Sequence, residues 1–186
     1  MAGSSVLGAL LLAALCAAKC ADKPTPRQLE LLKMEGTWYV LKHTNGLEKY
    51  SCGEVLVHAG FNNSVSWSVR YFDSTRNKWD GFSGQATKSS GKEGKLKASF
   101  WKPANSDDMF SELVQHNLDT WLLNKKYNDW AVLRTCREDS DSEFYLVLSR
   151  RRGLITNEDV TAKFTQGDMT DAKQDNCDTY KTFGGL

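Results

Sequence analysis

The feature of this sequence that most constrains its fold is an alternation of large apolar and small or charged side chains with a period of two. The clearest run reads Val65-Ser66-Trp67-Ser68-Val69-Arg70-Tyr71. Such alternation is typical of a β-strand with one buried and one solvent-facing side. Similar runs recur at 38–43, 54–59, 79–88, 95–102, 121–124, 130–136 and 143–150, separated by turn-forming residues. The pattern predicts about eight strands in an antiparallel meander.

Two architectures fit such a meander. Closing the sheet into a barrel removes its exposed edges, whereas a two-sheet sandwich buries the same alternating faces, and periodicity does not choose between them. Helix signals occur only near the ends: Thr25, Pro26 and Gln28 suit one helix start, and residues 156–159 with Gly167 suit the start and stop of another. The stretch 105–117 fits a strand extension, a hairpin or a loop over a barrel mouth.

The first residues predict export. Residues 6–18 are apolar or small, and Cys16 and Ala18 stand at the minus-three and minus-one positions of a peptidase site. A core helix or a membrane anchor is the alternative, but no apolar stretch approaches the roughly 20 residues that a span needs. We therefore expect a signal peptide at 1–18, a single domain at 19–186, and a secreted, extracellular protein that is not embedded in a membrane.

Charge and histidine content exclude several function classes. The chain has 24 Lys and Arg, 23 Asp and Glu, and a formal net charge of +1. No broad field attracts nucleic acid or anionic lipid, so neither is an expected partner. His43, His58 and His116 lack motif partners for a triad or a metal cluster. We predict no catalytic residue and no metal. Asn62 begins a glycosylation sequon and is the candidate glycosylation site.

Cysteine usage agrees with an oxidising compartment. Removal of the leader takes Cys16 with it and leaves four cysteines, Cys20, Cys52, Cys136 and Cys177. An even number in a secreted chain predicts two disulfides, although spacing alone allows three pairings. Zinc binding is the alternative, but no two of the four stand at the short spacing that zinc sites use.

Three separated segments resemble, in order, the motifs of the lipocalin family. They are Gly36-Thr37-Trp38-Tyr39 after a short helix, 124–131 with Tyr127 in its turn, and 144–150 with a final Ser149-Arg150. The resemblance implies an all-β, eight-stranded antiparallel up-and-down β-barrel, with a short N-terminal helix and a C-terminal helix packed on the barrel. It also implies a structural pair, in which Arg150 lies across the ring of Trp38 at the closed end.

The cysteines resemble those of one branch, which includes apolipoprotein D, insecticyanin and the bilin-binding proteins. That likeness implies Cys20–Cys136 and Cys52–Cys177 disulfides. A looser similarity links 69–73 and the cysteine surroundings to the triabin and nitrophorin group of salivary lipocalins. Some of those bind haem through a histidine on this strand, but here Arg70, Tyr71 and Phe72 occupy the region, so haem is not expected.

The family implies a carrier of one small hydrophobic ligand, such as a lipid, retinoid, carotenoid or bilin, inside the barrel. No cofactor is expected apart from such a bound pigment or lipid. Alternation and motif matching give the candidate ligand-binding residues Val40, Trp67, Val69, Tyr71, Phe82, Leu96, Phe100, Leu122, Leu133, Phe144 and Leu146. The alternative is that these side chains fill the barrel completely.

Two other functions remain open at this level. A salivary-type lipocalin scavenges mediators, or blocks a protease or receptor through its surface, where Trp79, Trp101 and Trp121 are candidate contacts for a protein partner or a second copy. A lipocalin isomerase needs a thiol facing the cavity, and the predicted disulfides use all four cysteines. We therefore expect a binding protein and not an enzyme.

Overall fold

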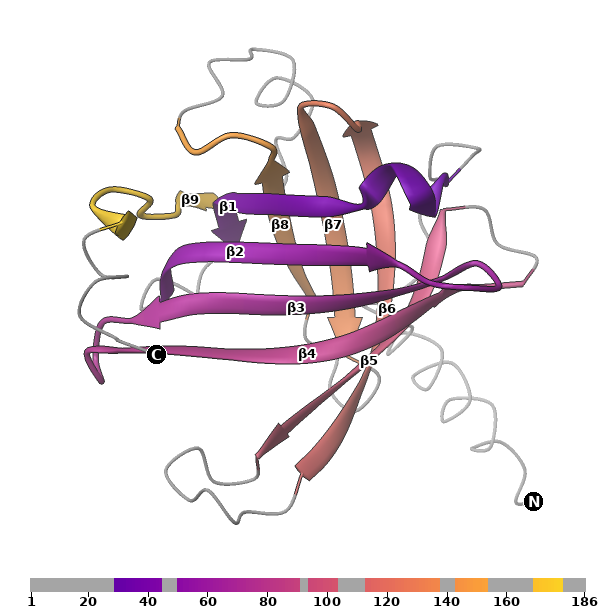
Figure 1. Cartoon of the computed structure of the whole chain (residues 1–186), viewed down its shortest axis with the longest axis horizontal. Coiled ribbons are helices and arrows are strands. Elements are labelled where there is room, and N and C mark those ends of the chain that lie inside the picture. The colour runs from indigo at the N-terminus through magenta and orange to yellow at the C-terminus, as the bar shows by residue number, and fades with distance from the viewer. Residues whose placement is uncertain are drawn as a thin grey trace, which may run out of the picture.

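A computed structural model of the chain describes residues 29–44, 50–90, 94–103, 113–137, 143–153 and 169–178 (Figure 1). A short 3-10 helix, η2 (Leu31–Met34), precedes the strands. The strands are β1 (Gly36–Thr44), β2 (Tyr50–Ala59), β3 (Ser64–Asp73), β4 (Lys78–Lys88), β5 (Lys95–Pro103), β6 (Leu113–Lys126), β7 (Trp130–Arg137), β8 (Glu143–Ser149) and β9 (Met169–Asp171).

The sheet closes on itself. Each strand from β2 to β7 pairs antiparallel with the next, β8 pairs with β1, and β1 pairs with β2. In Figure 1, β2, β3 and β4 lie side by side and β6, β7 and β8 cross behind them. The predicted eight-stranded up-and-down barrel is confirmed, and a two-sheet sandwich is excluded because one continuous sheet contains all these strands.

Two strands differ from the sequence prediction. β6 runs from Leu113 to Lys126 and pairs with β5 from Leu113 to Trp121, so the expected strand at 121–124 is much too short. It takes in 113–117 of the stretch left unassigned, and 104–112 lie outside the described residues. The unpredicted β9 adds to β1 through three pairs, Lys42 with Asp171 to Thr44 with Met169. Such a short strand carries no periodic signal.

The ends of the chain are described only in part. The predicted capping residues Thr25, Pro26 and Gln28, the signal peptide at 1–18 and the helix expected after 156 all lie outside the described residues. Asn62 is exposed in the turn between β2 and β3, and its glycosylation stays a prediction. Within the ranges that the structure describes, no helix is long and apolar enough to cross a membrane.

A packed core fills the end of the barrel where β1 begins. Trp38 has no exposed surface, and its indole Nε1 donates a hydrogen bond of 2.7 Å to the carbonyl of Met34 in η2. The Arg150 guanidinium lies 3.8 Å from the centre of the Trp38 ring. It donates to the carbonyls of Lys33, Thr37 and Tyr127 at 3.0, 3.2 and 3.1 Å. This end is therefore sealed by a cation that donates three hydrogen bonds to backbone carbonyls.

Candidate ligand-binding site

A cavity of about 370 Å³ occupies the part of the barrel away from Trp38. It is bordered by the second half of β1, the first parts of β2, β4, β6 and β8, the last residues of β3, β5 and β7, and Ala172 after β9. Its volume falls within the roughly 300–1,000 Å³ of typical small-molecule sites. The described side chains therefore leave room for a ligand at this end of the barrel.

Aromatic rings line one side of this cavity without a break. Tyr50, Tyr71, Phe82, Phe100 and His116 stand on the five consecutive strands β2 to β6. Successive ring centroids are 4.5, 6.3, 4.8 and 4.9 Å apart. We call these five residues the aromatic belt. The belt offers π faces and edges to a ligand, and spacings of 4.5 to 7 Å are those that aromatic pairs favour.

The rest of the apolar wall is mainly aliphatic. It consists of Val40, Gly53, Val55, Val69, Phe144, Leu146 and Ala172. Most of these residues alternate with outward-facing ones along β1, β2, β3 and β8, so the period of two that predicts the strands also places the wall. Ala172 is different, because it follows β9.

The polar groups of the cavity are basic or phenolic. Among the described lining residues, Lys102 and Arg137 are the basic ones besides histidine, and none is Asp or Glu. Arg137 Nη2 lies 3.4 Å from His116 Nδ1, and because a guanidinium only donates, that nitrogen of His116 accepts. Buried His43 has the opposite arrangement, since its Nδ1 donates to the carbonyl of Thr44 at 2.9 Å. Burial raises the pKa of the Tyr71 phenol well above its ordinary value, which keeps it a neutral donor.

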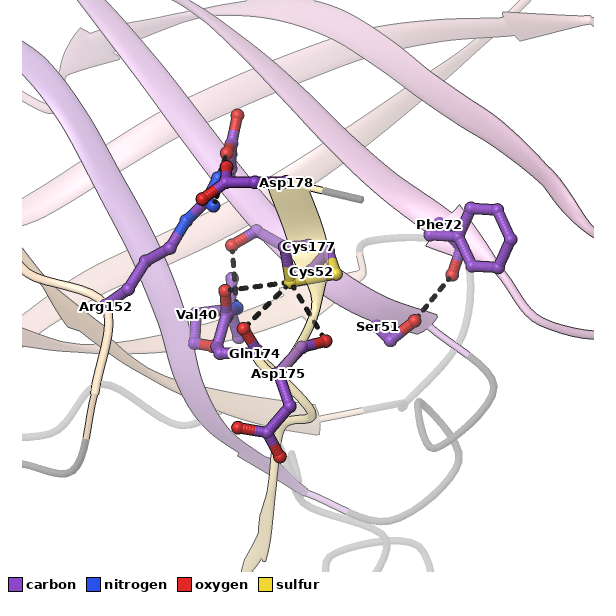
Figure 2. The surroundings of a disulfide bond; sticks show 11 residues. Val40, Ser51, Cys52, Phe72, Arg152, Gln174, Asp175, Cys177 and Asp178 are labelled. Atoms are coloured by element: carbon purple, nitrogen blue, oxygen red, sulfur yellow. Dashed lines mark hydrogen bonds and ion pairs between the residues drawn. A yellow bond between two sulfur atoms is a disulfide. The ribbon is translucent and has the colours of Figure 1, made fainter. Parts of the chain in front are cut away.

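Near the cavity, β1 leaves β2 and another piece of chain fills the gap between them (Figure 2). β1 pairs with β2 only from Gly36 to Tyr39. Beyond that point residues 169–177, which we call the wall segment, contact both strands. The amide of Ala172 donates to Leu41 at 2.8 Å, and the amide of Cys52 donates to Lys173 at 2.7 Å.

Gln174 of the wall segment bridges β1 and β2 with its side chain. Its side-chain amide donates to the carbonyls of Val40 at 2.8 Å and Gly53 at 3.2 Å, one on each strand. The predicted Cys52–Cys177 disulfide is present and ties the end of the segment to β2 (Figure 2). Cys52 lies at a β-bulge, where the pairing of β2 with β3 shifts register. The wall segment therefore completes the barrel wall.

The second predicted disulfide is described only on one side. Cys136 is disulfide-bonded, and Cys20 lies outside the described residues, so the Cys20–Cys136 pairing stays a prediction. In the part of the chain that the structure describes, no group of three His, Cys, Asp or Glu side chains is placed to hold a metal ion.

The structure brings seven of the eleven candidate ligand-binding residues to the cavity: Val40, Val69, Tyr71, Phe82, Phe100, Phe144 and Leu146. Trp67, Leu96, Leu122 and Leu133 belong instead to the hydrophobic core or pack against it. They share the inward parity but sit deeper along the barrel. Trp67 also packs against Gly84, where an added Cβ would lie 2.6 Å from its ring. Its ring centroid is 5.7 Å from that of Phe82 and 6.1 Å from that of Phe100, so it supports these two cavity residues from the core side.

Several lining residues were missed by sequence reasoning. They are His43, Tyr50, Gly53, Val55, Lys102, His116, Arg137 and Ala172. Parity alone holds a signal for two of them, because Lys102 follows Phe100 at a spacing of two, and His116 precedes Leu118 at the same spacing. A charged residue at a strand end normally indicates a solvent-exposed edge, so the inward parity of Lys102 is easily overlooked.

The three tryptophans proposed as outer contacts differ. Trp101 is 39% exposed. Trp79 is partly buried and packs on Phe72 and under the Arg70 guanidinium. Trp121 is only 1% exposed, with the charged groups of Lys95 and Arg134 at 4.8 and 4.6 Å from its ring. Trp121 is therefore not an accessible surface contact.

No family model and no curated protein matches this sequence. Solved structures do match the fold of this chain. The amine-binding protein of Rhodnius prolixus in its tryptamine complex has a TM-score of 0.63 and 17% identity, covering 77% of this chain and 76% of that one. The cockroach allergen Per a 4 has a TM-score of 0.62 and 14% identity, covering 86% of this chain and 98% of that one. Apocrustacyanin C1 has a TM-score of 0.58 and 17% identity, covering 81% and 84%. Together with the closed barrel, these likenesses show that the chain has the lipocalin fold.

Proposed function

We propose that this protein is a secreted member of the lipocalin family that carries one small hydrophobic ligand in its barrel. The observation that carries the proposal is the cavity of about 370 Å³, walled by the aromatic belt and aliphatic side chains while the other end of the barrel is packed solid. Apolar walls with a few placed polar groups are the usual form of a small-molecule site. The amine-binding protein of Rhodnius prolixus, which has a similar barrel, supports a carrier function.

Export is supported by two independent features. The apolar leader has the length and small-residue ending of a signal peptide. The Cys52–Cys177 disulfide suits an oxidising compartment, where such bonds persist. We propose that the protein acts outside the cell.

Binding without chemistry is the simplest activity for this cavity. All three described cysteines are disulfide-bonded, so the described wall supplies no thiol nucleophile. His116 has Arg137 at its Nδ1 and Phe100 against its ring, which is not the arrangement of a base oriented by a carboxylate.

A blocked cavity tests the carrier function. Leu146 lines the cavity, so Leu146→Trp fills part of it, whereas Leu56→Trp adds the same ring at a position 36% exposed on β2. We expect saturable uptake of a neutral fluorescent probe, N-phenyl-1-naphthylamine, by the native protein and the Leu56→Trp control, and at least tenfold weaker uptake by Leu146→Trp. No saturable uptake by the native protein, or equal uptake by both variants, contradicts the proposal.

A function through the outer surface is the second candidate. Trp101 and Leu113 are 39% and 61% exposed and share the outer face where the last residues of β5 pair with the first residues of β6, whereas Val114 has the inward parity of His116. Exposed apolar groups that gather in one place mark contact sites in many proteins. Sedimentation with and without added lipid extract tests this candidate, which predicts self-association that Trp101→Ser reduces and that ligand does not affect.

A further inference from the structure

We infer that the cavity prefers hydrophobic ligands with an acidic head group, a carboxylate held at Lys102 and Arg137, over amines and alcohols of the same shape. The inference rests on the proposed carrier function. It concerns which end of a ligand enters last and what charge that end bears. The argument comes from the position of the two cations relative to the aromatic belt.

The charge of the described wall has one sign. Lys102 and Arg137 are cationic, and no carboxylate is among the lining residues that the structure describes. Two described acids, Asp73 and Asp80, stand two residues from a belt residue, and both accept a hydrogen bond from Arg76. Asp80 also accepts the amide of Gly81 at 2.7 Å and is further stabilised by the charge of Lys102. A positive charge entering this cavity therefore meets cations in the wall, and a negative charge meets partners.

Both cations stand at the open end of the apolar wall. Lys102 is two residues beyond Phe100 near the end of β5, and Arg137 is the last residue of β7. β5 and β7 run in the same direction, because both pair antiparallel with β6. Lys102 pairs with Val114 and Arg137 with Leu118, so the two cations flank His116 from the strands on either side of β6. A ligand body resting on the belt therefore has Lys102 and Arg137 beside its His116 end.

Arg137 is positioned by the belt itself. The Phe100 and His116 rings are stacked at 4.9 Å with an interplanar angle of 25°, and His116 Nδ1 accepts from Arg137 Nη2 at 3.4 Å. The chain of contacts runs from apolar ring to polar ring to guanidinium. A carboxylate on a ligand stacked along these rings is well placed for the planar, forked recognition that guanidinium groups give to carboxylates.

The rival ligand is an amine, since aromatic faces also attract cations. That attraction needs the wall to be neutral or acidic, because like charges at short range in a partly desolvated site repel strongly. With Lys102 and Arg137 in the wall, we expect the belt to serve as an apolar and stacking surface and not as a cage for ammonium groups. The two ligand classes are separable by experiment.

Three ligands with one body and different heads provide the test: indole-3-propionate, tryptophol and tryptamine, each displacing N-phenyl-1-naphthylamine near neutral pH. We expect the acid to bind at least tenfold tighter than the alcohol, and the amine to bind most weakly. Lys102→Met and Arg137→Met should each weaken the acid about tenfold while leaving tryptophol within about twofold. Lys97→Met, on the exposed side of β5, is the matched control and should change none of the three.

The outcomes separate the two proposals. If the native protein binds neither the probe nor any of the three ligands, the carrier function fails. If the alcohol or the amine binds as well as the acid, the carrier function stands and the acid preference is overturned. The preference is also overturned if Lys102→Met and Arg137→Met still take up the probe and retain native affinity for the acid. Should Arg137→Met not fold, the native series with Lys102→Met and the charge-preserving Arg137→Lys decides.

Discussion

Removal of the Cys52–Cys177 disulfide should both destabilise the barrel and loosen its wall beside the cavity. The bond joins residues 125 apart in sequence, and on the chain-entropy account closing a loop of that length stabilises the fold by about 5 kcal/mol. The double variant Cys52→Ser with Cys177→Ser should therefore lose about 2 to 5 kcal/mol of unfolding free energy, the range found when native disulfides are removed from small secreted domains.

The wall segment should remain docked but open more often. It keeps the hydrogen bonds of Ala172 to Leu41, of Cys52 to Lys173 and of Gln174 to Val40 and Gly53. At about 1 kcal/mol net for each bond, these four contribute roughly as much as the disulfide. We therefore expect partial loss of anchoring, seen as faster hydrogen exchange at the amide of residue 172 and as weaker probe uptake.

Urea unfolding followed by tryptophan fluorescence gives the global change, and hydrogen exchange with mass spectrometry gives the local one. Gln174→Met is the control for the two hydrogen bonds by which the Gln174 side chain holds the wall segment. It retains the disulfide and removes both side-chain bonds, so it should cost about 1 to 3 kcal/mol and should also speed exchange at residue 172. A double cysteine variant that loses under about 1 kcal/mol and keeps native protection of 169–177 would refute the view that this disulfide holds the wall.

Two further predictions concern charge away from the cavity. Arg150→Met removes three hydrogen bonds to carbonyls at the closed end and a cation over an indole ring, so it should lower the unfolding free energy measured in urea by about 3 to 5 kcal/mol. Arg151 has an 81% exposed side chain, so Arg151→Met should lower it by under about 1 kcal/mol. Equal losses in the two variants would contradict this prediction. Hydrogen bonds from the Thr75 hydroxyl, then from Arg76, hold the pKa of Asp73 well below its ordinary value. A depressed pKa stabilises the fold fully when the pH is above the pKa of the unfolded chain, about 3.9, and stabilises it less as the pH falls below that value. Asp73→Asn should therefore reduce the loss of unfolding free energy between neutral and acidic pH. An unchanged loss in the variant would refute this assignment.

Most strands could be predicted because alternation is a local property of each strand. The run from Val65 to Tyr71 gives most of β3, and the alternating segments before and after it predict their strands in the same way. Alternation does not predict the full length of β6, because its inward positions include His116 and Thr120, which interrupt the apolar pattern. β9 defeats it because three residues hold no period, and its place depends on the point at which β1 leaves β2.

The site was harder to predict than the fold, for reasons that are geometric. Parity tells which residues face inward but not how deep along the barrel they lie. Trp67 and Tyr71 share one face of β3, yet Trp67 packs on the core while Tyr71 lines the cavity. The depth of a residue along the barrel depends on the register between strands, and the sequence of a single strand does not determine that register. Lys102 and Arg137 were missed for the same reason, because only the closed barrel shows that two strand ends face one cavity.

The separation of the two ends of the barrel explains how one fold can take different ligands. At the closed end, Arg150 binds backbone carbonyls, which every sequence supplies, so the seal survives large changes elsewhere in the chain. At the open end, Lys102 and Phe100 contribute to the wall through their side chains alone. Changes there alter ligand chemistry without removing the contacts that hold the fold. Barrels alike at TM-scores near 0.6 with only 14 to 17% identity are what this division predicts. Ligand class must therefore be read from the open end of each chain and not from its neighbours.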